Sequence, residues 1–328
     1  MSAVVSKVTR RRSGFLSVLQ GSPILGPFVV LLLFTIFFSL TTPQFLAGPN
    51  LSLIVQQVMV VGTLAIGQTL VILTAGIDLS NGTVMALGSV IMTSFAVQFG
   101  VNPILAILCG ILVCVAFGLL NGSLVTMIRL PAFIVTLGTL NIAYALTRIY
   151  TTSTISNLPQ FMLFFGSTFR VGSTEITYGS VLMFVLYVIA WFILRSTPAG
   201  RSVYAVGDNP EAARLAGINT TRVLIGVYTT AALTYGIAAL LLVARTGVGD
   251  PQAGQTSNLD SITAVVLGGT SLFGGRGHII GTLIGALIVG VIRNGLQLNG
   301  LGSNLQVLIT GILVIVAVSI DQLSHRSK

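Results

Sequence analysis

Residues 249–256, Gly-Asp-Pro-Gln-Ala-Gly-Gln-Thr, have the glycine spacing of a phosphate-binding loop. A Walker-type loop needs a lysine where Gln255 stands, because its ammonium group contacts the phosphates. The only lysines of the chain are Lys7 and Lys328, near its two ends. The sequence therefore excludes a Walker-type ATP site in this chain. If ATP drives its activity, we expect a separate subunit to hydrolyse it.

Other groups that could do chemistry are few. The only histidines are His278 and His325, and the two cysteines, Cys109 and Cys114, lie within one apolar run without a CxxC or Cys/His cluster. This pattern does not support a zinc site or a disulfide framework. We predict a protein that is not an enzyme, with no catalytic residue and no bound cofactor or metal.

Neutral polar side chains are spread through the apolar runs of the chain, among them Gln57, Gln68 and Asn141. Each could form a hydrogen bond between helices, worth about 0.6–2 kcal/mol. Together they suit a polar, uncharged route for a hydroxyl-rich solute, and we predict Gln57, Gln68 and Asn141 as residues of a translocation pathway. The alternative is an ion-coupled secondary transporter, which the lack of carboxylates in the middle of the runs disfavours.

The composition places these side chains in a membrane. Hydrophobic residues make up 54% of the 328 residues and charged residues 7%, whereas a soluble domain carries about 25% charged residues. A soluble enzyme, a nucleic-acid-binding module and a disordered protein are therefore excluded. A spanning helix needs about 20 mostly apolar residues. Ten runs are candidates: 24–42, 51–73, 82–100, 103–127, 132–150, 179–195, 223–244, 259–275, 279–298 and 304–322.

The basic residues predict the orientation of these spans. With a cytoplasmic N-terminus and ten crossings, twelve of the 16 lysines and arginines fall on the cytoplasmic side, in agreement with the positive-inside rule. We predict cytoplasmic tails at 1–23 and 324–328, one transmembrane domain at 24–323, and a long cytoplasmic loop at 196–222. The run at 259–275 is short and rich in glycine, so a full span and a re-entrant helix both stay open.

The chain also carries a weak internal repeat. On the ten-span threading, the paired spans run in opposite directions, and such inverted repeats are typical of transporters. We predict an all-α integral membrane protein of about ten transmembrane helices with inverted repeat halves. The segments 75–78, 83–88, 118–122 and 134–138 resemble 246–250, 263–268, 290–295 and 307–311, in that order.

The cytoplasmic loop contains the start and stop signals of a short helix. Asp208 or Asn209 can cap its N-terminus, Pro210 takes the first helical position and Glu211 the first turn. Gly217 supplies the stop. A defined helix that stands alone on the inner face predicts a docking site for a cytoplasmic partner.

Three segments resemble the permease subunits of carbohydrate ABC importers of the ribose type, a family with fructose, xylose and galactose relatives. They are Leu73-Thr-Ala-Gly-Ile-Asp-Leu-Ser80, Gly207-Asp-Asn-Pro-Glu-Ala-Ala-Arg-Leu-Ala-Gly-Ile-Asn219 and Leu259-Asp-Ser-Ile-Thr-Ala-Val-Val-Leu-Gly-Gly-Thr-Ser-Leu-Phe-Gly-Gly-Arg-Gly277. They occur in the expected order across nearly the whole chain.

The resemblance implies a fold, partners and a location. The fold would be the type II permease fold, similar to that of vitamin B12 importers, in the bacterial inner membrane. A periplasmic binding protein would deliver a monosaccharide such as ribose or fructose, and a second permease chain, in a homodimer, would complete the pore. An ATP-binding subunit would dock on a coupling helix made of Asp208, Asn209, Glu211, Ala212, Ala213, Arg214 and Gly217.

Three alternatives stay open. An ABC permease for an amino acid, a nucleoside or an autoinducer would share this architecture. An ion-coupled secondary transporter would need no ATPase subunit. A membrane receptor without transport would leave the polar residues within the spans and the inverted repeat unexplained.

Overall fold

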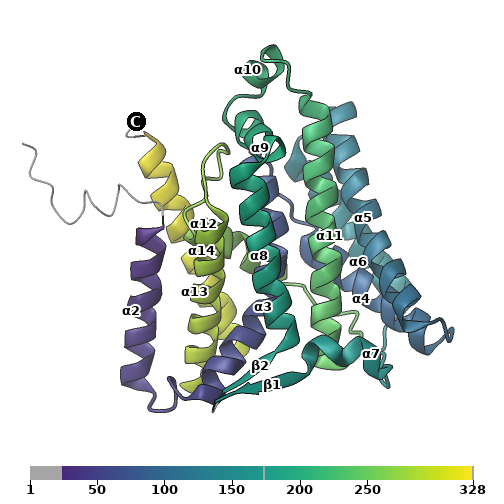
Figure 1. Cartoon of the computed structure of the whole chain (residues 1–328), viewed down its shortest axis with the longest axis vertical. Helices are drawn as coiled ribbons and strands as arrows, with labels where there is room; N and C mark the ends of the chain where they lie inside the picture. Colours follow the sequence, from purple (N-terminus) through teal and green to yellow (C-terminus); the bar gives the residue numbers. More distant parts are fainter. Residues whose placement is uncertain (1–23, 173, 327–328) are drawn as a thin grey trace, which may run out of the picture.

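The computed structural model describes residues 24–172 and 174–326, and these residues are almost wholly helical (Figure 1). The predicted N-terminal tail, 1–23, lies outside the described residues. The elements are α2 (Leu25–Thr41), α3 (Gly48–Leu73), α4 (Asn81–Val97), α5 (Pro103–Met127), α6 (Ala132–Tyr150), α7 (Gln160–Leu163), a short 3₁₀ turn (Phe164–Gly166), β1 (Thr168–Val171), β2 (Thr174–Thr177), α8 (Tyr178–Ser196), α9 (Pro198–Asp208), α10 (Pro210–Leu215), α11 (Thr220–Thr246), α12 (Ser257–Leu267), α13 (Ile279–Leu298) and α14 (Ser303–Arg326).

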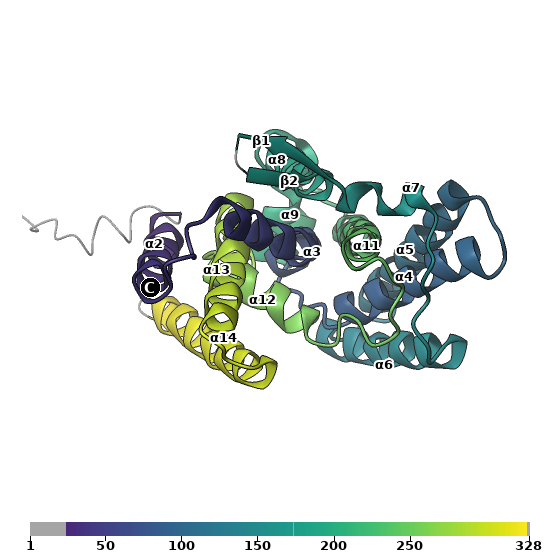
Figure 2. The same ribbon diagram turned by 90° about the horizontal axis from the view of Figure 1, so that it is seen from below.

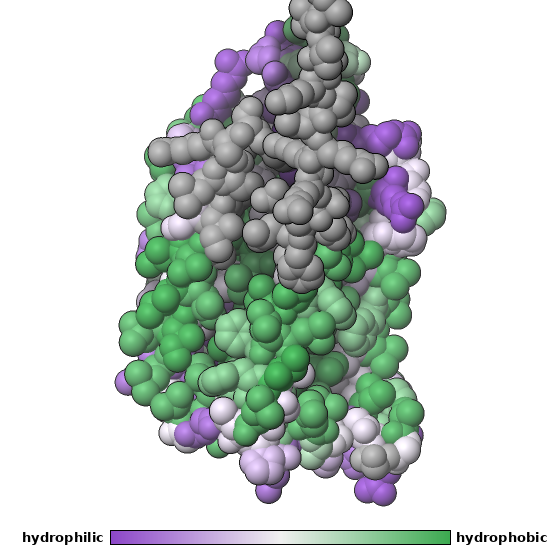
Figure 3. All heavy atoms as spheres, turned by 90° about the vertical axis from the view of Figure 1, so that its left-hand side faces the viewer, coloured by the Kyte–Doolittle hydropathy of each residue, from purple (hydrophilic) through white to green (hydrophobic). Residues whose placement is uncertain are grey.

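Within the described ranges, six helices are long and apolar enough to cross a membrane: α3, α5, α6, α8, α11 and α13. Shorter apolar helices are α2, α4 and the segment Asn304–Leu313 of α14. A band of hydrophobic side chains covers the middle of the face that α2 presents, with hydrophilic residues at both ends (Figure 3). This confirms the prediction of a multi-pass membrane protein built of helices.

The run at 259–275 is the one that the structure shortens. Its helix, α12, has 11 residues, which at 1.5 Å per residue span about 16 Å, against about 30 Å for the hydrocarbon core of a bilayer. An irregular segment, 268–278, follows α12, and Gly269, Gly274 and Gly275 adopt positive φ angles there. By its length, α12 alone cannot cross a bilayer.

Two helices form the centre of the bundle. In both α3 and α11, 72% of the most apolar window is buried, against 28% in α5, α6 and α8. Glycine allows α5 to approach α11 closely, because a Cβ at Gly118 would overlap Ala232 and the Tyr228 carbonyl. The absence of a side chain at Gly118 therefore permits the close contact between α5 and α11.

The bundle has two different ends (Figure 1). At one end, β1 and β2 form an antiparallel hairpin in which Arg170 lies opposite Glu175, and the Ser52 hydroxyl at the start of α3 donates to the Glu175 carbonyl. At the other end, α10 projects beyond the long helices, and α9 lies between α10 and α8. Seen along the bundle, α6 and α14 lie on the opposite side from α8 (Figure 2).

Candidate functional site

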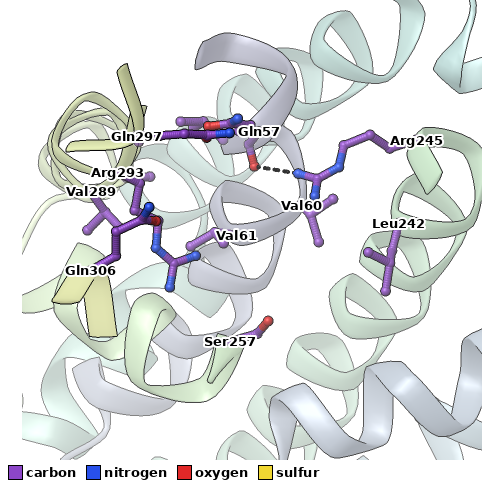
Figure 4. A pocket seen from close by; sticks show the side chains of 13 residues that line it. Gln57, Val60, Val61, Leu242, Arg245, Ser257, Val289, Arg293, Gln297 and Gln306 are labelled. Atoms are coloured by element: carbon purple, nitrogen blue, oxygen red, sulfur yellow. Dashed lines mark hydrogen bonds between the residues drawn. The ribbon is translucent and has the colours of Figure 1, made fainter. Parts of the chain in front are cut away.

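A polar pocket opens among the central helices at the hairpin end of the bundle (Figure 4). Its volume is about 240 Å³, below the ~300–1,000 Å³ of pockets for drug-sized ligands. The polar side chains that line it come from five helices: Gln57 of α3, Arg245 of α11, Ser257 of α12, Arg293 and Gln297 of α13, and Gln306 of α14.

The two arginines of the pocket have different partners. Arg245 donates from Nη1 to the Gln57 carbonyl at 3.4 Å, whereas Arg293 donates from Nη2 to Oδ1 of Asp260 at 2.5 Å. Asp260 is 1% exposed, and its second carboxylate oxygen has no hydrogen-bond partner among the described residues. The Asp260–Arg293 ion pair thus ties α12 to α13 beside the pocket.

The side chains of this pocket can form hydrogen bonds with a small polar solute. Guanidinium groups supply donors only, while the amides of Gln57, Gln297 and Gln306 supply donors and acceptors. A sugar hydroxyl can satisfy both kinds of group. Among the described residues, no three His, Cys, Asp or Glu side chains gather as a metal ion would require.

The predicted pathway residues occupy three different environments. Gln57 lines the pocket. Gln68 is fully buried away from it, where Oε1 accepts from Asn81 Nδ2 at 2.9 Å and Asn81 also donates to Ser261 at 2.8 Å. Asn141 is exposed on α6, with its amide donating to the Leu137 carbonyl at 2.9 Å. The structure does not bring the three together, and their role in a pathway stays a prediction.

The short helix within the loop 196–222, α10, has the ends that the sequence predicts. Asn209, not Asp208, caps it, with Oδ1 accepting from the Ala212 amide at 3.0 Å. At the other end, Gly217 has a φ of 86°, and the amide of Gly217 donates to the Arg214 carbonyl at 3.0 Å. The amide of Ile218 donates to the Ala213 carbonyl, also at 3.0 Å. These two hydrogen bonds make the end of α10 a Schellman motif.

The predicted coupling residues form one exposed knob. Ala213 is buried, and the other predicted coupling residues are exposed: Asp208, Asn209, Glu211, Ala212, Arg214 and Gly217. Glu211 and Arg214 pair at 3.1 Å. At such exposed positions an ion pair is worth about 0–1 kcal/mol, so this pair leaves the knob free to bind a partner.

The other helix of the loop, α9, contacts the bundle through glycine. A Cβ at Gly207 would overlap the carbonyl of Leu73, the last residue of α3. The same carbonyl accepts from the Gly275 amide at 3.0 Å. Gly207, Leu73 and Gly275 form what we call the glycine joint, which connects α9, the end of α3 and the segment that follows α12.

Tyr204 adds a hydrogen bond beside the glycine joint. Its hydroxyl donates to the Gly277 carbonyl at 2.9 Å. Burial raises the pKa of the Tyr204 phenol, so the hydroxyl stays protonated and keeps its role as a donor at neutral pH.

Sequence reasoning missed three features of this site. The first is α9, although Thr197 followed by Pro198 is a helix start, and the Thr197 hydroxyl accepts from the Gly200 amide at 3.2 Å. The second is Leu215, which is 79% exposed on α10. The third is the convergence of Arg245 and Arg293, which have no sequence signal because they lie on different helices.

The comparisons with known proteins agree with this picture. The fructose import permease protein FrcC of Rhizobium meliloti is 47% identical over 311 residues, which cover 93% of this chain and 86% of that protein. The ribose import permease protein RbsC of Bacillus subtilis is 41% identical over 301 residues, with coverage of 91% and 92%. The galactose/methyl galactoside import permease protein MglC of Haemophilus influenzae is 32% identical over 317 residues, with coverage of 92% and 94%.

No solved structure matches the chain. A family model matches residues 50–318, and its description is "Branched-chain amino acid transport system / permease component". Permeases of this kind are transport components rather than enzymes. The chain belongs to this permease family.

Proposed function

We propose that the chain is the membrane-spanning subunit of an ATP-driven importer that moves a monosaccharide into the cell. The relatives named above are import permeases for fructose, ribose and galactose, which are neutral polyhydroxylated solutes whose hydroxyls can form hydrogen bonds with the side chains of the pocket. The family description names branched-chain amino acids instead, so an amino acid is the second candidate solute.

One observation carries the proposal. The glycine joint connects the exposed knob of α10, through α9, to the end of α3, and the other half of α3 lines the pocket with Gln57. A partner that pulls on α10 can therefore change the shape of the pocket at the opposite end of the bundle. In this scheme an ATP-binding subunit docks on α10, and a periplasmic binding protein delivers the solute at the β1–β2 end.

The order and length of the helices support the ten-span, type II arrangement with inverted halves. The two central helices, α3 and α11, have 26 and 27 residues. An irregular segment and a shorter helix follow each of them, α4 with 17 residues and α12 with 11. Two longer helices follow in each half: α5 and α6 after α4, and α13 and α14 after α12. The two sets are therefore α3–α6 and α11–α14. The repeated sequence segments fall on corresponding elements of these two sets.

The positive-inside rule supports cytoplasmic termini and a location in the bacterial inner membrane. The predicted boundaries are part of the proposal: a transmembrane domain at 24–323, preceded by a cytoplasmic tail at 1–23 and followed by one at 324–328. The end of the bundle that carries α10 is then cytoplasmic, and the pocket opens toward the periplasm.

A polar stripe on α6 supports a second copy of the chain as a partner. Asn141, Tyr144 and Arg148 share one face of this otherwise apolar helix, and Arg148 donates to the Tyr144 hydroxyl at 3.3 Å. Polar and charged groups are costly against lipid and usually face protein or water. In the proposed homodimer, the side with α6 and α14 faces the second copy, and Asn141 faces the pathway between them.

Cysteine cross-linking tests the homodimer. We expect single cysteines at Asn141 or Tyr144, in a background that lacks Cys109 and Cys114, to trap most of the chain as a disulfide-linked dimer in native membranes. Val188→Cys on α8 is the control, because Val188 is 62% exposed on the opposite side of the bundle. Equal cross-linking at Val188, or no cross-linking at the α6 positions, would contradict the proposed dimer interface.

Uptake in intact cells tests the function. We expect gene-dependent import of a labelled monosaccharide that survives an uncoupler sparing ATP and stops when ATP is depleted. The panel includes ribose, fructose, galactose and a branched-chain amino acid. Leu215→Asp should lower this import by about tenfold or more, because an apolar anchor of a docking surface is worth 1.4 kcal/mol or more. Leu215→Met should retain it.

The alternatives give different results in the same assay. Import that collapses with the ion gradient while ATP remains would indicate a secondary transporter. Import of the branched-chain amino acid and of none of the sugars would show that the solute is an amino acid and not a monosaccharide. Full import by Leu215→Asp would show that α10 does not dock the ATPase.

A further inference from the structure

A second cavity, of about 350 Å³, lies in a groove between α8, α9 and α11, away from the polar pocket. Its walls are apolar and include Leu70 of α3, Ile193 of α8, Val203 of α9, and Val223 and Val227 of α11. We call it the lipid groove, for the reasons that follow.

The lipid groove runs along the bundle from one membrane surface inward. On α11 it extends from Arg222 to Thr230, and the eight steps between these two residues cover about 12 Å at 1.5 Å each. Arg222 lies in the first turn of α11 and Ile193 in the last turn of α8, so this end of the groove is at the α9–α10 end of the bundle. Ile193 is 40% exposed, and Gly226 is exposed with no atom within 4 Å of where its Cβ would be. The groove is thus open along its side.

The charge at the outer end of the groove is positive. Arg222 is exposed there, beside Ser202 of α9. Within residues 24–172 and 174–326, none of the ion pairs involves Arg222. Arg195 and Arg201 lie on the neighbouring ends of α8 and α9, and no acidic residue lines the groove. An apolar body about 12 Å long below a cationic rim matches an anionic amphiphile.

We propose that the lipid groove binds one anionic phospholipid of the cytoplasmic leaflet, with an acyl chain between α8 and α11 and the phosphate at Arg222. Basic sites between helices on the cytoplasmic side are known to bind such headgroups. The groove lies on the side away from α6 and α14 (Figure 2), so it stays in contact with the bilayer when a second copy covers those helices. The polar side chains that line the groove are those of Ser202, Arg222 and Thr230, so the groove offers few hydrogen-bond partners to a polar solute.

The bound lipid would brace α9 against the bundle. Its chain contacts α8, α9 and α11 together, and α9 ends beside Gly207 of the glycine joint. Lipid binding requires a membrane environment but not the transport activity. The lipid-binding proposal and the proposed transport function can therefore fail independently.

Native mass spectrometry of the full purified chain tests the site. The probe is an equal mixture of phosphatidylglycerol and phosphatidylcholine with the same acyl chains. We expect each wild-type chain to retain one phosphatidylglycerol under conditions that remove phosphatidylcholine. Arg222→Gln should lower this retention by about fivefold or more, the effect of one arginine near an anionic headgroup. Gly226→Leu should lower it too, because the added side chain enters the groove from a position whose Cβ meets no atom within 4 Å.

Matched variants separate the site from general effects. Arg129→Gln removes an exposed arginine at the end of α5, outside the groove, and Gly26→Leu adds the same side chain at an open position on α2. Both should retain the lipid as the wild type does. Equal retention of the two lipids, equal loss in Arg222→Gln and Arg129→Gln, or full retention by Gly226→Leu would each overturn the proposal.

The single tryptophan of the chain provides a second readout. Trp191 is 36% exposed on α8, one helical turn from Leu194 of the groove. In phosphatidylcholine vesicles, a small amount of phosphatidylglycerol with brominated acyl chains should quench its fluorescence in a saturable step. This step should be absent in Gly226→Leu, whose unchanged emission without brominated lipid shows that the fold is intact. Quenching that rises only in proportion to the brominated lipid, as at any exposed position, would contradict a defined site.

Discussion

Replacing Gly207 by alanine is expected to lower the amount of solute imported per ATP hydrolysed by about tenfold. The added methyl group would overlap the Leu73 carbonyl, so α9 must move away from the end of α3. The hydrogen bond of 3.0 Å between the Gly275 amide and that carbonyl would be strained or lost. A lost buried hydrogen bond costs about 1–3 kcal/mol, and 1.4 kcal/mol is a factor of ten in an equilibrium.

The measurement is import and ATP hydrolysis by the complete transporter, reconstituted with its ATPase subunit and its binding protein. The matched control is Gly26→Ala, which makes the same change at a position on α2, outside the groove, with no atom within 4 Å of the new Cβ. It should import like the wild type. If Gly207→Ala does so as well, the glycine joint does not transmit the motion. Equal losses of import and hydrolysis would indicate a docking or folding defect instead.

Replacing Arg293 by glutamine is expected to destabilise the protein by about 3–5 kcal/mol, the typical cost of leaving one partner of a buried ion pair alone. Asp260 is 1% exposed and its carboxylate accepts from Arg293 at 2.5 Å. The other carboxylate oxygen has no partner among the described residues, so nothing else there offsets the charge.

The double variant Asp260→Asn/Arg293→Gln should recover most of this loss, because it removes both charges together. Arg245→Gln is the control from the same pocket. Among the described residues, Arg245 forms one side-chain hydrogen bond, to a backbone carbonyl at 3.4 Å, so its replacement should cost about 0.5 kcal/mol or less. The free energy of unfolding in mixed micelles, measured at increasing denaturant, gives all four values. A double variant as unstable as Arg293→Gln would show that the ion pair is not the cause.

Local patterns in the sequence predicted the local features of the fold. The cap, which the sequence left open between Asp208 and Asn209, and the stop at Gly217 follow from neighbouring residues, and the structure confirms both. The ends of most long helices follow from the lengths of the apolar runs. The short length of α12 was left open, because an apolar run does not reveal where tertiary contacts end a helix.

The assembly of the pocket could not be predicted in the same way. Gln57, Arg245 and Arg293 lie far apart in the chain, and only the packing of α3, α11 and α13 brings them together. The sequence suggested a pathway from the types of its neutral polar residues, but type alone does not distinguish Gln57 in the pocket from Gln68 in a buried network. In the sequence, Arg245 and Arg293 are isolated basic residues at or near the ends of apolar runs, so their part in the pocket could not be predicted.

The shortness of α12 also constrains how the ribosome and the translocon make this protein. A helix of 11 residues that contains Asp260 is a poor substrate for release into lipid, because it is too short to span and carries a costly charge. Its counter-charge, Arg293, is synthesised 33 residues later and lies on α13. Neither charge is neutralised in the bilayer until both helices are present. Membrane integration of this part of the chain is therefore expected to be a joint event of α12 and α13.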